Sequence, residues 1–283
     1  MNVCYLHIGA PKTGTSAIQD FLLTNQDYLY ANGFVYPNPG LHKDDRQAND
    51  GNSKSILKAI LHDDRDLASE LNNTLRSLLK SENVILSAED LFNRAYENGF
   101  DIIRCILKDV EVKVILYVRL QSEIFESAIK QRIRNHNKTD YEIPQEFYKK
   151  FDWFNCAALW AAEFGRGNVA VREYKSKKSD ISIEADFLNV LGIQNNLDKY
   201  NKERESINES LTGMQLEFMR LVNGLNLEDK SFNRIKDAVI NTFKFEVGSE
   251  SWCLQRNKVR EVNQHFKESN EKLFKCYGVK IIP

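Results

Sequence analysis

The chain has 283 residues, of which 42% are hydrophobic and 28% charged, as in ordinary folded globular proteins. Its 39 Lys and Arg residues balance 40 Asp and Glu residues, and this net charge of −1 argues against a nucleic-acid-coating protein. No run approaches ~18 consecutive apolar residues, and the N-terminus shows no secretion-signal pattern, so we expect no membrane span. The five cysteines lack C-x-x-C spacing, which predicts reduced thiols and a cytoplasmic location.

The N-terminal half alternates apolar strand patterns with helical patterns. Residues 3–8 are rich in strand formers and end at Gly9, and apolar residues at helical spacing follow from Ser16. The polar, proline-containing segment 37–53 predicts a long loop that could cover a site. Beyond it the patterns predict one or two helices at 56–79, a strand at 83–87, a helix at 91–107 in which Gly99 is a candidate interruption, and a strand at 112–118.

The C-terminal half adds one strand and several helices. Residues 169–174 predict a fourth strand and 185–191 a helix that Gly192 ends, and helical patterns prevail from Ser210 onward. Continuous apolar strands separated by helices are what a parallel sheet covered on both faces requires. We therefore predict an α/β fold with a P-loop-like parallel β-sheet flanked by helices on both faces. We expect one domain over 1–283, with a helix-rich C-terminal part from about residue 205, because no linker or repeat interrupts the chain.

The segment 9–16, with the sequence G-A-P-K-T-G-T-S, carries the main functional signal. It follows a strand pattern and opens a helix, where backbone amides and the helix dipole bind phosphate groups. The nucleoside-triphosphate loop is G-x-x-x-x-G-K-[ST], but here Thr15 stands at the lysine position and the lysine is Lys12. A lysine at that point suits a donor with one 5′-phosphate and a terminal sulfate, because it can stabilise charge that develops on the bridging oxygen.

Residues 6–16 resemble the 5′-phosphosulfate-binding motif of the sulfotransferase superfamily, especially its bacterial and carbohydrate-directed members. The resemblance implies transfer of a sulfuryl group from 3′-phosphoadenosine 5′-phosphosulfate (PAPS), with 3′-phosphoadenosine 5′-phosphate (PAP) as the product. It implies that Lys12 is catalytic. The donor would be bound by Pro11, Lys12, Thr13, Gly14, Thr15 and Ser16.

The family also holds the donor's 3′-phosphate with an arginine that closes a later strand and a serine eight residues further on. Arg119 and Ser127 match these two positions. The proline that often follows the arginine is absent here, and Ala128 and Ile129 stand where an aromatic residue is common. Taken without the resemblance, Arg119 could instead form a strand-end salt bridge with Glu123 or Glu126.

The resemblance implies a histidine or glutamate that accepts the proton of the acceptor hydroxyl. Glu89 is the first candidate, because it follows a predicted strand and should lie at the same sheet edge as the loop. The alternative interpretation of residues 87–90, S-A-E-D, is a helix cap. His7 is the second candidate base, although a histidine in a buried strand is more often a core residue with its hydrogen bonds satisfied. His42, in the polar loop, is a further candidate, although most loop histidines have no catalytic role.

The acceptor is the least specified part of the prediction. The resemblance favours a hydroxyl on a carbohydrate, a small hydroxylated metabolite stays open, and segments 37–53 and 135–153 are candidates to bind it. No H-E-x-x-H motif occurs and the histidines are scattered, so we expect no metal. Two other functions stay open, namely a P-loop-type kinase and a non-catalytic nucleotide-binding protein, and nothing indicates an oligomeric state.

Overall fold

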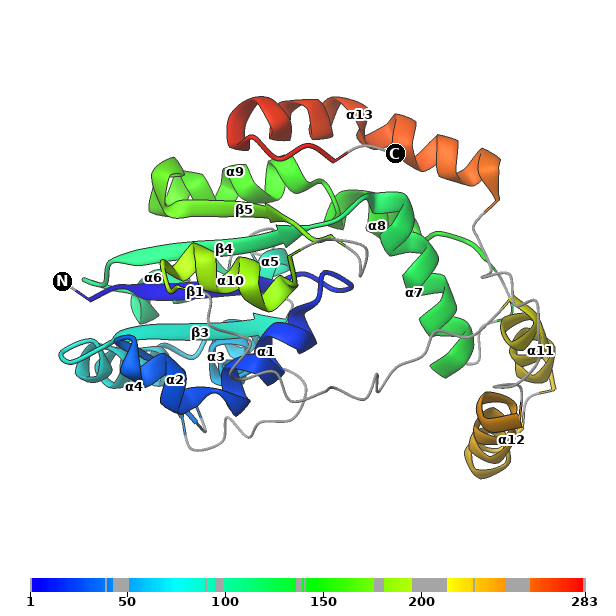
Figure 1. Ribbon diagram of the computed structural model, residues 1–283, viewed down its shortest axis with the longest axis horizontal. Coiled ribbons are helices and arrows are strands. Elements are labelled where there is room, and N and C mark those ends of the chain that lie inside the picture. Colours follow the sequence, from blue (N-terminus) through cyan, green and yellow to red (C-terminus); the bar gives the residue numbers. More distant parts are fainter. Residues whose placement is uncertain are drawn as a thin grey trace. The chain divides into compact units, whose positions relative to one another are not determined.

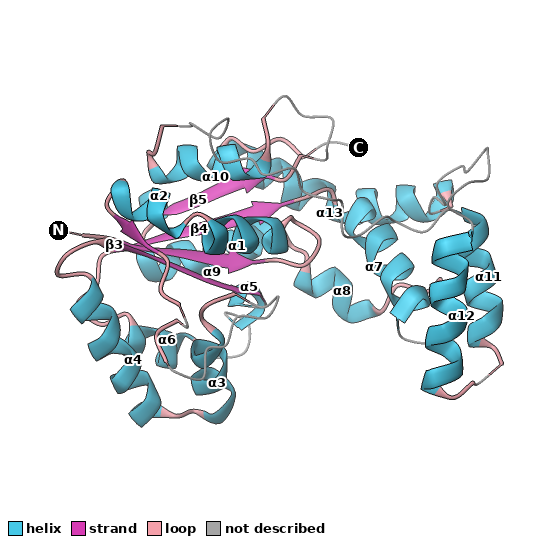
Figure 2. Cartoon of the chain, turned by 60° about the horizontal axis from the view of Figure 1, so that its bottom comes forward, coloured by secondary structure: helices cyan, strands magenta, loops and turns pink. Residues whose placement is uncertain are grey.

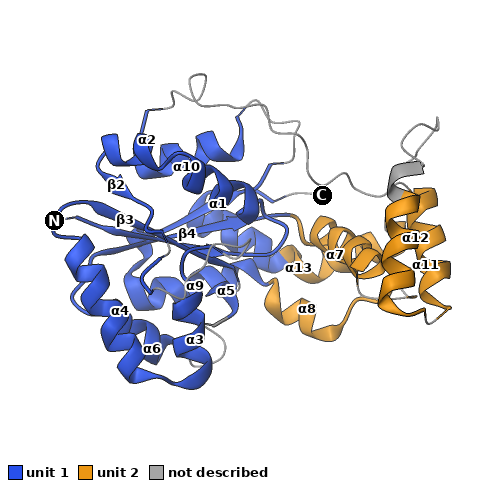
Figure 3. Ribbon diagram, turned by 90° about the horizontal axis from the view of Figure 1, so that it is seen from below, with its two compact units in different colours: residues 1–119, 152–201, 268–282 blue, residues 120–151, 202–267, 283 orange. Residues whose placement is uncertain are grey.

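The computed structural model describes residues 2–38, 40–42, 51–89, 91–94, 99–135, 139, 141–175, 181–194, 213–225, 227–242 and 255–281 (Figure 1). The chain divides into two compact units (Figure 3). Unit 1 comprises Met1–Arg119, Asp152–Asn201 and Glu268–Ile282, and unit 2 comprises Leu120–Phe151, Lys202–Lys267 and Pro283. The single domain expected from the sequence stays a prediction.

Unit 1 is built on a five-stranded sheet with the order β2-β3-β1-β4-β5, in which every neighbouring pair is parallel. The strands are β1 (Cys4–Gly9), β2 (Phe34–Val35), β3 (Asn83–Glu89), β4 (Val112–Val118) and β5 (Val169–Glu173). The predicted α/β class is confirmed. Register pairs His7 with Ser87 and Gly9 with Glu89, so β1 and β3 end side by side.

Helices cover both faces of this sheet (Figure 3). One face carries α1 (Thr15–Thr24), α2 (Gln26–Ala31) and α10 (Ile183–Leu191), and the other carries α3 (Lys54–His62), α4 (Arg65–Leu78), α5 (Leu91–Arg94), α6 (Phe100–Ile106) and α9 (Trp153–Phe164), which the 3₁₀ turn η2 (Arg166–Asn168) follows. On the first face Ile18, Leu22 and Phe187 are completely buried. On the second, the rings of Phe92 and Trp153 lie 6.1 Å apart. Each such side chain contributes about 1.5–3 kcal/mol through burial.

Two predicted helical stretches are divided. Residues 56–79 form two helices because Asp63 takes a left-handed conformation, with φ of 47°, and Asp64 caps the second helix by accepting a hydrogen bond from Leu67 N at 2.9 Å. Residues 91–107 also form two helices, with Gly99 directly before the second. β3 runs two residues beyond its predicted end and therefore includes Glu89.

The described elements of unit 2 are helices (Figure 2). They are α7 (Gln121–Asn135), α8 (Gln145–Lys150), α11 (Gly213–Asn223), α12 (Asp229–Thr242) and the first half of α13 (Arg256–Tyr277), whose residues from Glu268 belong to unit 1. Ile133, Leu216 and Phe232 belong to one apolar cluster that joins three of them. Among the described residues of the whole chain, no helix is long and apolar enough to cross a membrane.

Candidate functional site

The β1–α1 loop, residues 10–14, is closed by its own side chains. The hydroxyls of Thr13 and Thr15 both donate to the carbonyl oxygen of Ala10, at 2.7 and 3.0 Å, and both residues are buried. Helix α1 starts directly after this loop; its N-cap residue is Gly14, which has no side chain to cap it, and its own first turn contains no acidic residue. The positive end of the helix dipole at this turn suits an anionic ligand.

Two residues of the loop have left-handed backbone conformations, Lys12 with φ of 65° and Gly14 with φ of 81°. A Cβ atom on Gly14 would lie 2.4 Å from Ile183 Cδ1 and 2.7 Å from Tyr174 Cε2, so only glycine fits there. For Lys12 this conformation costs about 1–2 kcal/mol. Residues with strained backbone conformations concentrate at functional sites, so the strain at Lys12 is consistent with a functional role for this residue.

Arg119 and Tyr174 extend the site to the next two strands. Arg119 follows β4, and its Nη1 donates to the carbonyl oxygen of Lys12 at 3.3 Å. Its guanidinium carbon lies 5.3 Å from the ring centre of Tyr174, which directly follows β5. Tyr174 also covers Gly14, as the distances above show. The carboxyl ends of three parallel strands thus supply a loop, a cation and an aromatic ring, in agreement with where α/β sheets bind ligands.

Tyr174 is a site residue that sequence reasoning did not identify. Its position directly after an apolar strand was the available signal, because the residue after a parallel strand lies at the carboxyl edge of the sheet. Its contact with Gly14 depends on the tertiary fold and leaves no local pattern.

Glu89, the first candidate base, is the last residue of β3 and is partly exposed. It pairs in register with Gly9, the residue that precedes the β1–α1 loop. Segment 51–53 runs along the other edge of β3, where Gly51 forms an antiparallel bridge with Ala88. The structure therefore places Glu89 and the β1–α1 loop at one edge of the sheet.

The two histidine candidates lie in different surroundings. His7 is completely buried, its Nδ1 lies 2.9 Å from Ser87 Oγ, and its ring meets Tyr117 and Phe187 edge-on. Burial lowers the pKa of His7 to about 3, so the ring is neutral near pH 7. His42 Nε2 lies 3.7 Å from Glu70 Oε1 on α4. Ser87 is a strand residue whose hydroxyl lies against His7, so Ser87 itself caps no helix, and Asp90, the last residue of the cap alternative, lies outside the described residues.

The other sequence candidates are distributed over the two units. Ser16 is exposed in the first turn of α1, and Pro11 is half-buried in the loop before it. Ser127 is half-buried on α7 in unit 2, and its role beside Arg119 stays a prediction. Among the proposed acceptor segments, 39 and 43–50 lie outside the described residues, as do 136–138 and 140. Within the described ranges, no group of His, Cys, Asp and Glu side chains could hold a metal ion.

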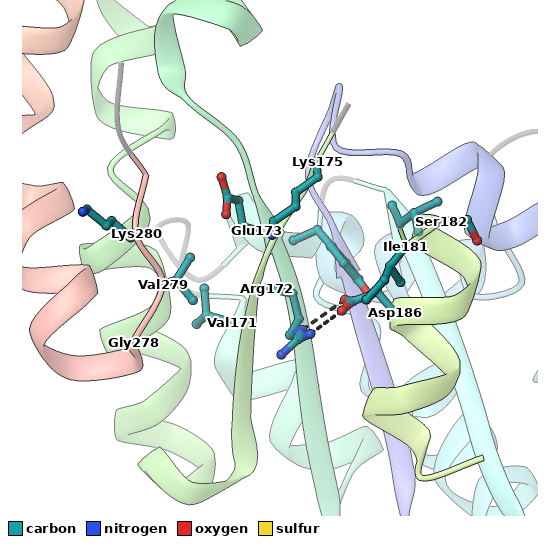
Figure 4. Close-up of a pocket in the computed structure, with 12 residues that line it drawn as sticks. Val171, Arg172, Glu173, Lys175, Ile181, Ser182, Asp186, Gly278, Val279 and Lys280 are labelled. Carbon is teal, nitrogen blue, oxygen red and sulfur yellow. Dashed lines mark hydrogen bonds and ion pairs between the residues drawn. The ribbon is translucent and has the colours of Figure 1, made fainter. Parts of the chain in front are cut away.

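A cavity of about 330 Å³ lies between β5, the start of α10 and residues 278–280 (Figure 4). Arg172 and Asp186 point toward one another in it and form an ion pair, with Nε and Oδ2 3.0 Å apart, and Asp186 Oδ2 also accepts a hydrogen bond from Tyr117 at 2.8 Å. Ile183 lines the cavity and also lies against Gly14. The cavity therefore adjoins the residues that cover the β1–α1 loop.

The sequence matches no protein-family model and shows no significant similarity to a curated protein. The residues of this site and their geometry are therefore the basis for inferring a function.

Proposed function

We propose that the protein is a sulfotransferase that moves a sulfuryl group from PAPS to a hydroxyl, with a carbohydrate as the preferred class of acceptor. The observation that carries this proposal is the position of Lys12 inside the β1–α1 loop, with Arg119 hydrogen-bonded to its carbonyl oxygen. A triphosphate loop has its lysine after the second glycine, where this chain has Thr15. The hydroxyl of Thr15 is bonded to Ala10 inside the loop.

The residues present fit the two phosphate groups of such a donor. The backbone amides at the start of α1, together with residues 11–16, would bind the 5′-phosphate. Arg119, at the end of β4, would bind the 3′-phosphate, for which a guanidinium offers two parallel hydrogen bonds. The ring of Tyr174 already lies against this guanidinium and limits its motion. Ser127 is the second 3′-phosphate ligand expected from the resemblance.

In the transfer, the acceptor oxygen forms a bond to sulfur while the bond between sulfur and the bridging oxygen breaks. The electron pair of the broken bond stays on the 5′-phosphate of PAP, where the ammonium of Lys12 stabilises the developing negative charge. The proton of the acceptor hydroxyl passes to the carboxylate of Glu89, which lies beside the loop at the end of β3. Atoms and charge balance without a metal ion or a redox partner.

Glu89 suits the role of base better than His7 does. The imidazole of His7 is completely enclosed, and its Nδ1 is already hydrogen-bonded to Ser87. With a pKa lowered to about 3 by burial, His7 would also be a weak proton acceptor near neutral pH. Glu89 is partly exposed, so an acceptor hydroxyl can approach it.

Calorimetric titration with PAP, and separately with ATP and magnesium, tests the donor class. We expect PAP to bind tightly and ATP to bind at least tenfold more weakly, because the lysine that a triphosphate loop uses is absent from position 15. Lys12→Met should weaken PAP binding, whereas Lys80→Met, which removes an exposed lysine from the turn after α4, should not. A preference for ATP would overturn the proposal in favour of a kinase. Tight PAP binding with no transfer to any hydroxyl acceptor would indicate a nucleotide-binding protein without turnover.

A further inference from the structure

Three polar side chains from three elements meet in the core beside the β1–α1 loop. They are His7 on β1, Ser87 on β3 and Gln19 on α1, with exposed fractions of 0%, 0% and 6%. Ser87 Oγ lies 2.9 Å from His7 Nδ1 and accepts a hydrogen bond from Gln19 Nε2 at 3.1 Å. We call these three residues the polar cluster.

The hydrogen bonds of the polar cluster define the tautomer of His7. Gln19 donates to Ser87 Oγ, and among the described residues His7 Nδ1 is the one acceptor that this hydroxyl contacts, so we assign the hydroxyl proton to the bond with His7 Nδ1. The imidazole proton then lies on Nε2. In this arrangement His7 Nε2 is a donor and Gln19 Oε1 an acceptor, and both are buried with no hydrogen-bond partner among the described residues. Unpaired buried polar atoms cost stability, so core packing alone does not explain why polar side chains stand at these positions.

Ser87 is also held from its other side by segment 51–53. Its backbone N–H donates to Asn52 Oδ1 at 2.9 Å, and Asn52 N donates back to Ser87 O at 3.1 Å. A Cβ atom on Gly51 would lie 2.1 Å from Ser87 O and 2.6 Å from Gln19 Nε2, and the φ of Gly51 is +86°. Ser87 is therefore fixed along both its backbone and its side chain.

The location of the polar cluster links the two halves of the candidate site. Ser87 precedes Glu89 by two residues on β3. Gln19 lies one turn beyond Thr15 and Ser16, which open α1. His7 lies on the strand that leads into the β1–α1 loop and is paired in register with Ser87. A displacement of α1 relative to β3 would move the anion-binding turn away from Glu89, and errors of about 1 Å in such alignment can lower a rate a hundredfold.

We propose that His7, Ser87 and Gln19 are positioning residues, which hold the first turn of α1 in a fixed place relative to Glu89. This inference rests on the proposed sulfuryl transfer, because it assigns Glu89 and the β1–α1 loop to one reaction. None of the three side chains touches the reacting atoms. Their effect is exerted through the backbone of β3 and through helix α1.

The test compares Ser87→Ala and Gln19→Met with Asn72→Ala. Asn72 is a matched control because it is also a buried polar residue of unit 1, donating to Ile106 O at 2.8 Å and Lys108 O at 3.0 Å. All three variants should lower the melting temperature. Only the two cluster variants should lower kcat, by about 10- to 100-fold, while KM for the acceptor changes less than about threefold. If the cluster variants keep the kcat of Asn72→Ala, the proposal is overturned.

The wild-type protein offers a second test that requires no variant to fold. The ¹⁵N chemical shifts of His7 should report the tautomer protonated at Nε2, whether or not a nucleotide is present. A proton on Nδ1 would contradict the hydrogen-bond directions that we assign to the polar cluster. The failure of the proposed function and the failure of this inference can be told apart. If the wild-type protein does not bind PAP, both the proposed function and the inference are overturned. PAP binding and turnover in wild type, with cluster variants like the control, overturns the inference alone.

Discussion

Lowering the pH from 7.5 to 5 should destabilise the protein through His7. Burial lowers the pKa of this histidine from 6.5 to about 3 in the folded state. Between these two values the unfolded chain binds a proton that the folded chain excludes, so the free energy of unfolding falls as the pH falls. The contribution of neutral His7 to the free energy of unfolding is fully present above about pH 6.5 and is lost progressively as the pH falls toward 3. Integrating from 6.5 downward gives a loss of about 2 kcal/mol at pH 5.

The surroundings of His7 support assigning this effect to burial. Among the described residues, the hydrogen-bond and ring partners of His7 are Ser87 on β3, Tyr117 on β4 and Phe187 on α10, with Gln19 on α1 joined through the hydroxyl of Ser87. Tyr117 is the one among these four that titrates, and burial together with the neighbouring Asp186 raises its pKa, so it stays neutral across this range. None of these four side chains carries a charge that would compensate a protonated imidazole.

Urea unfolding at several pH values between 7.5 and 5, at constant ionic strength, measures this loss. The matched variant is His7→Gln, which keeps a polar side chain but does not titrate. Its stability will be lower at every pH, but its change between pH 7.5 and 5 should be smaller than that of wild type by about 2 kcal/mol. Carboxylates contribute equally to both proteins and cancel. Identical pH dependence in the two proteins would show that His7 does not cause the loss of stability.

Three further outcomes follow from the site geometry. Gly14→Ala should weaken PAP binding at least tenfold by calorimetry and lower the melting temperature, since its Cβ would meet Ile183 and Tyr174 at 2.4 and 2.7 Å. Gly51→Ala should lower the free energy of unfolding in urea by about 2–3 kcal/mol, because Gly51 has a positive φ and an added Cβ would lie 2.1 Å from the backbone oxygen of Ser87. A variant as stable as the wild type would contradict this expectation. Lys12→Met should lower kcat by about a hundredfold or more in a sulfate-transfer assay, because removal of one group that stabilises transition-state charge has an effect of this size. An unchanged kcat would show that Lys12 has no role in the mechanism.

The long strands were predictable because their apolar runs are continuous. β1, β3, β4 and β5 begin and end within two residues of the predicted positions, as buried parallel strands allow. β2 was missed because its two residues, Phe34 and Val35, are too few to show any period. The pattern over 56–79 allowed one or two helices, but it did not predict the position of the break at Asp63, since a left-handed aspartate leaves the helical spacing of apolar residues intact.

The candidate site was predictable where it depends on strand ends. Lys12, Glu89 and Arg119 were placed at one sheet edge because each follows or ends a parallel strand, and the register of β1 with β3 bears this out for Glu89 and the loop. The polar cluster could not be predicted, because His7 and Ser87 are 80 residues apart in sequence and meet only through that register. Sequence reasoning anticipated the burial of His7 but not its partners.

The position of the lysine, rather than the presence of a phosphate-type loop, distinguishes the two chemistries considered for this protein. In a triphosphate loop the lysine opens the helix and reaches the outer phosphates. Here Lys12 lies inside the loop in a strained conformation, and Arg119 donates to its carbonyl oxygen, so two cationic residues share one edge of the sheet. Two cations at one edge repel each other, and an anionic ligand bound beside them weakens that repulsion. The proposed donor carries a 5′-phosphosulfate and a 3′-phosphate on one ribose, so under the proposal Lys12 and Arg119 each contact a different anionic group.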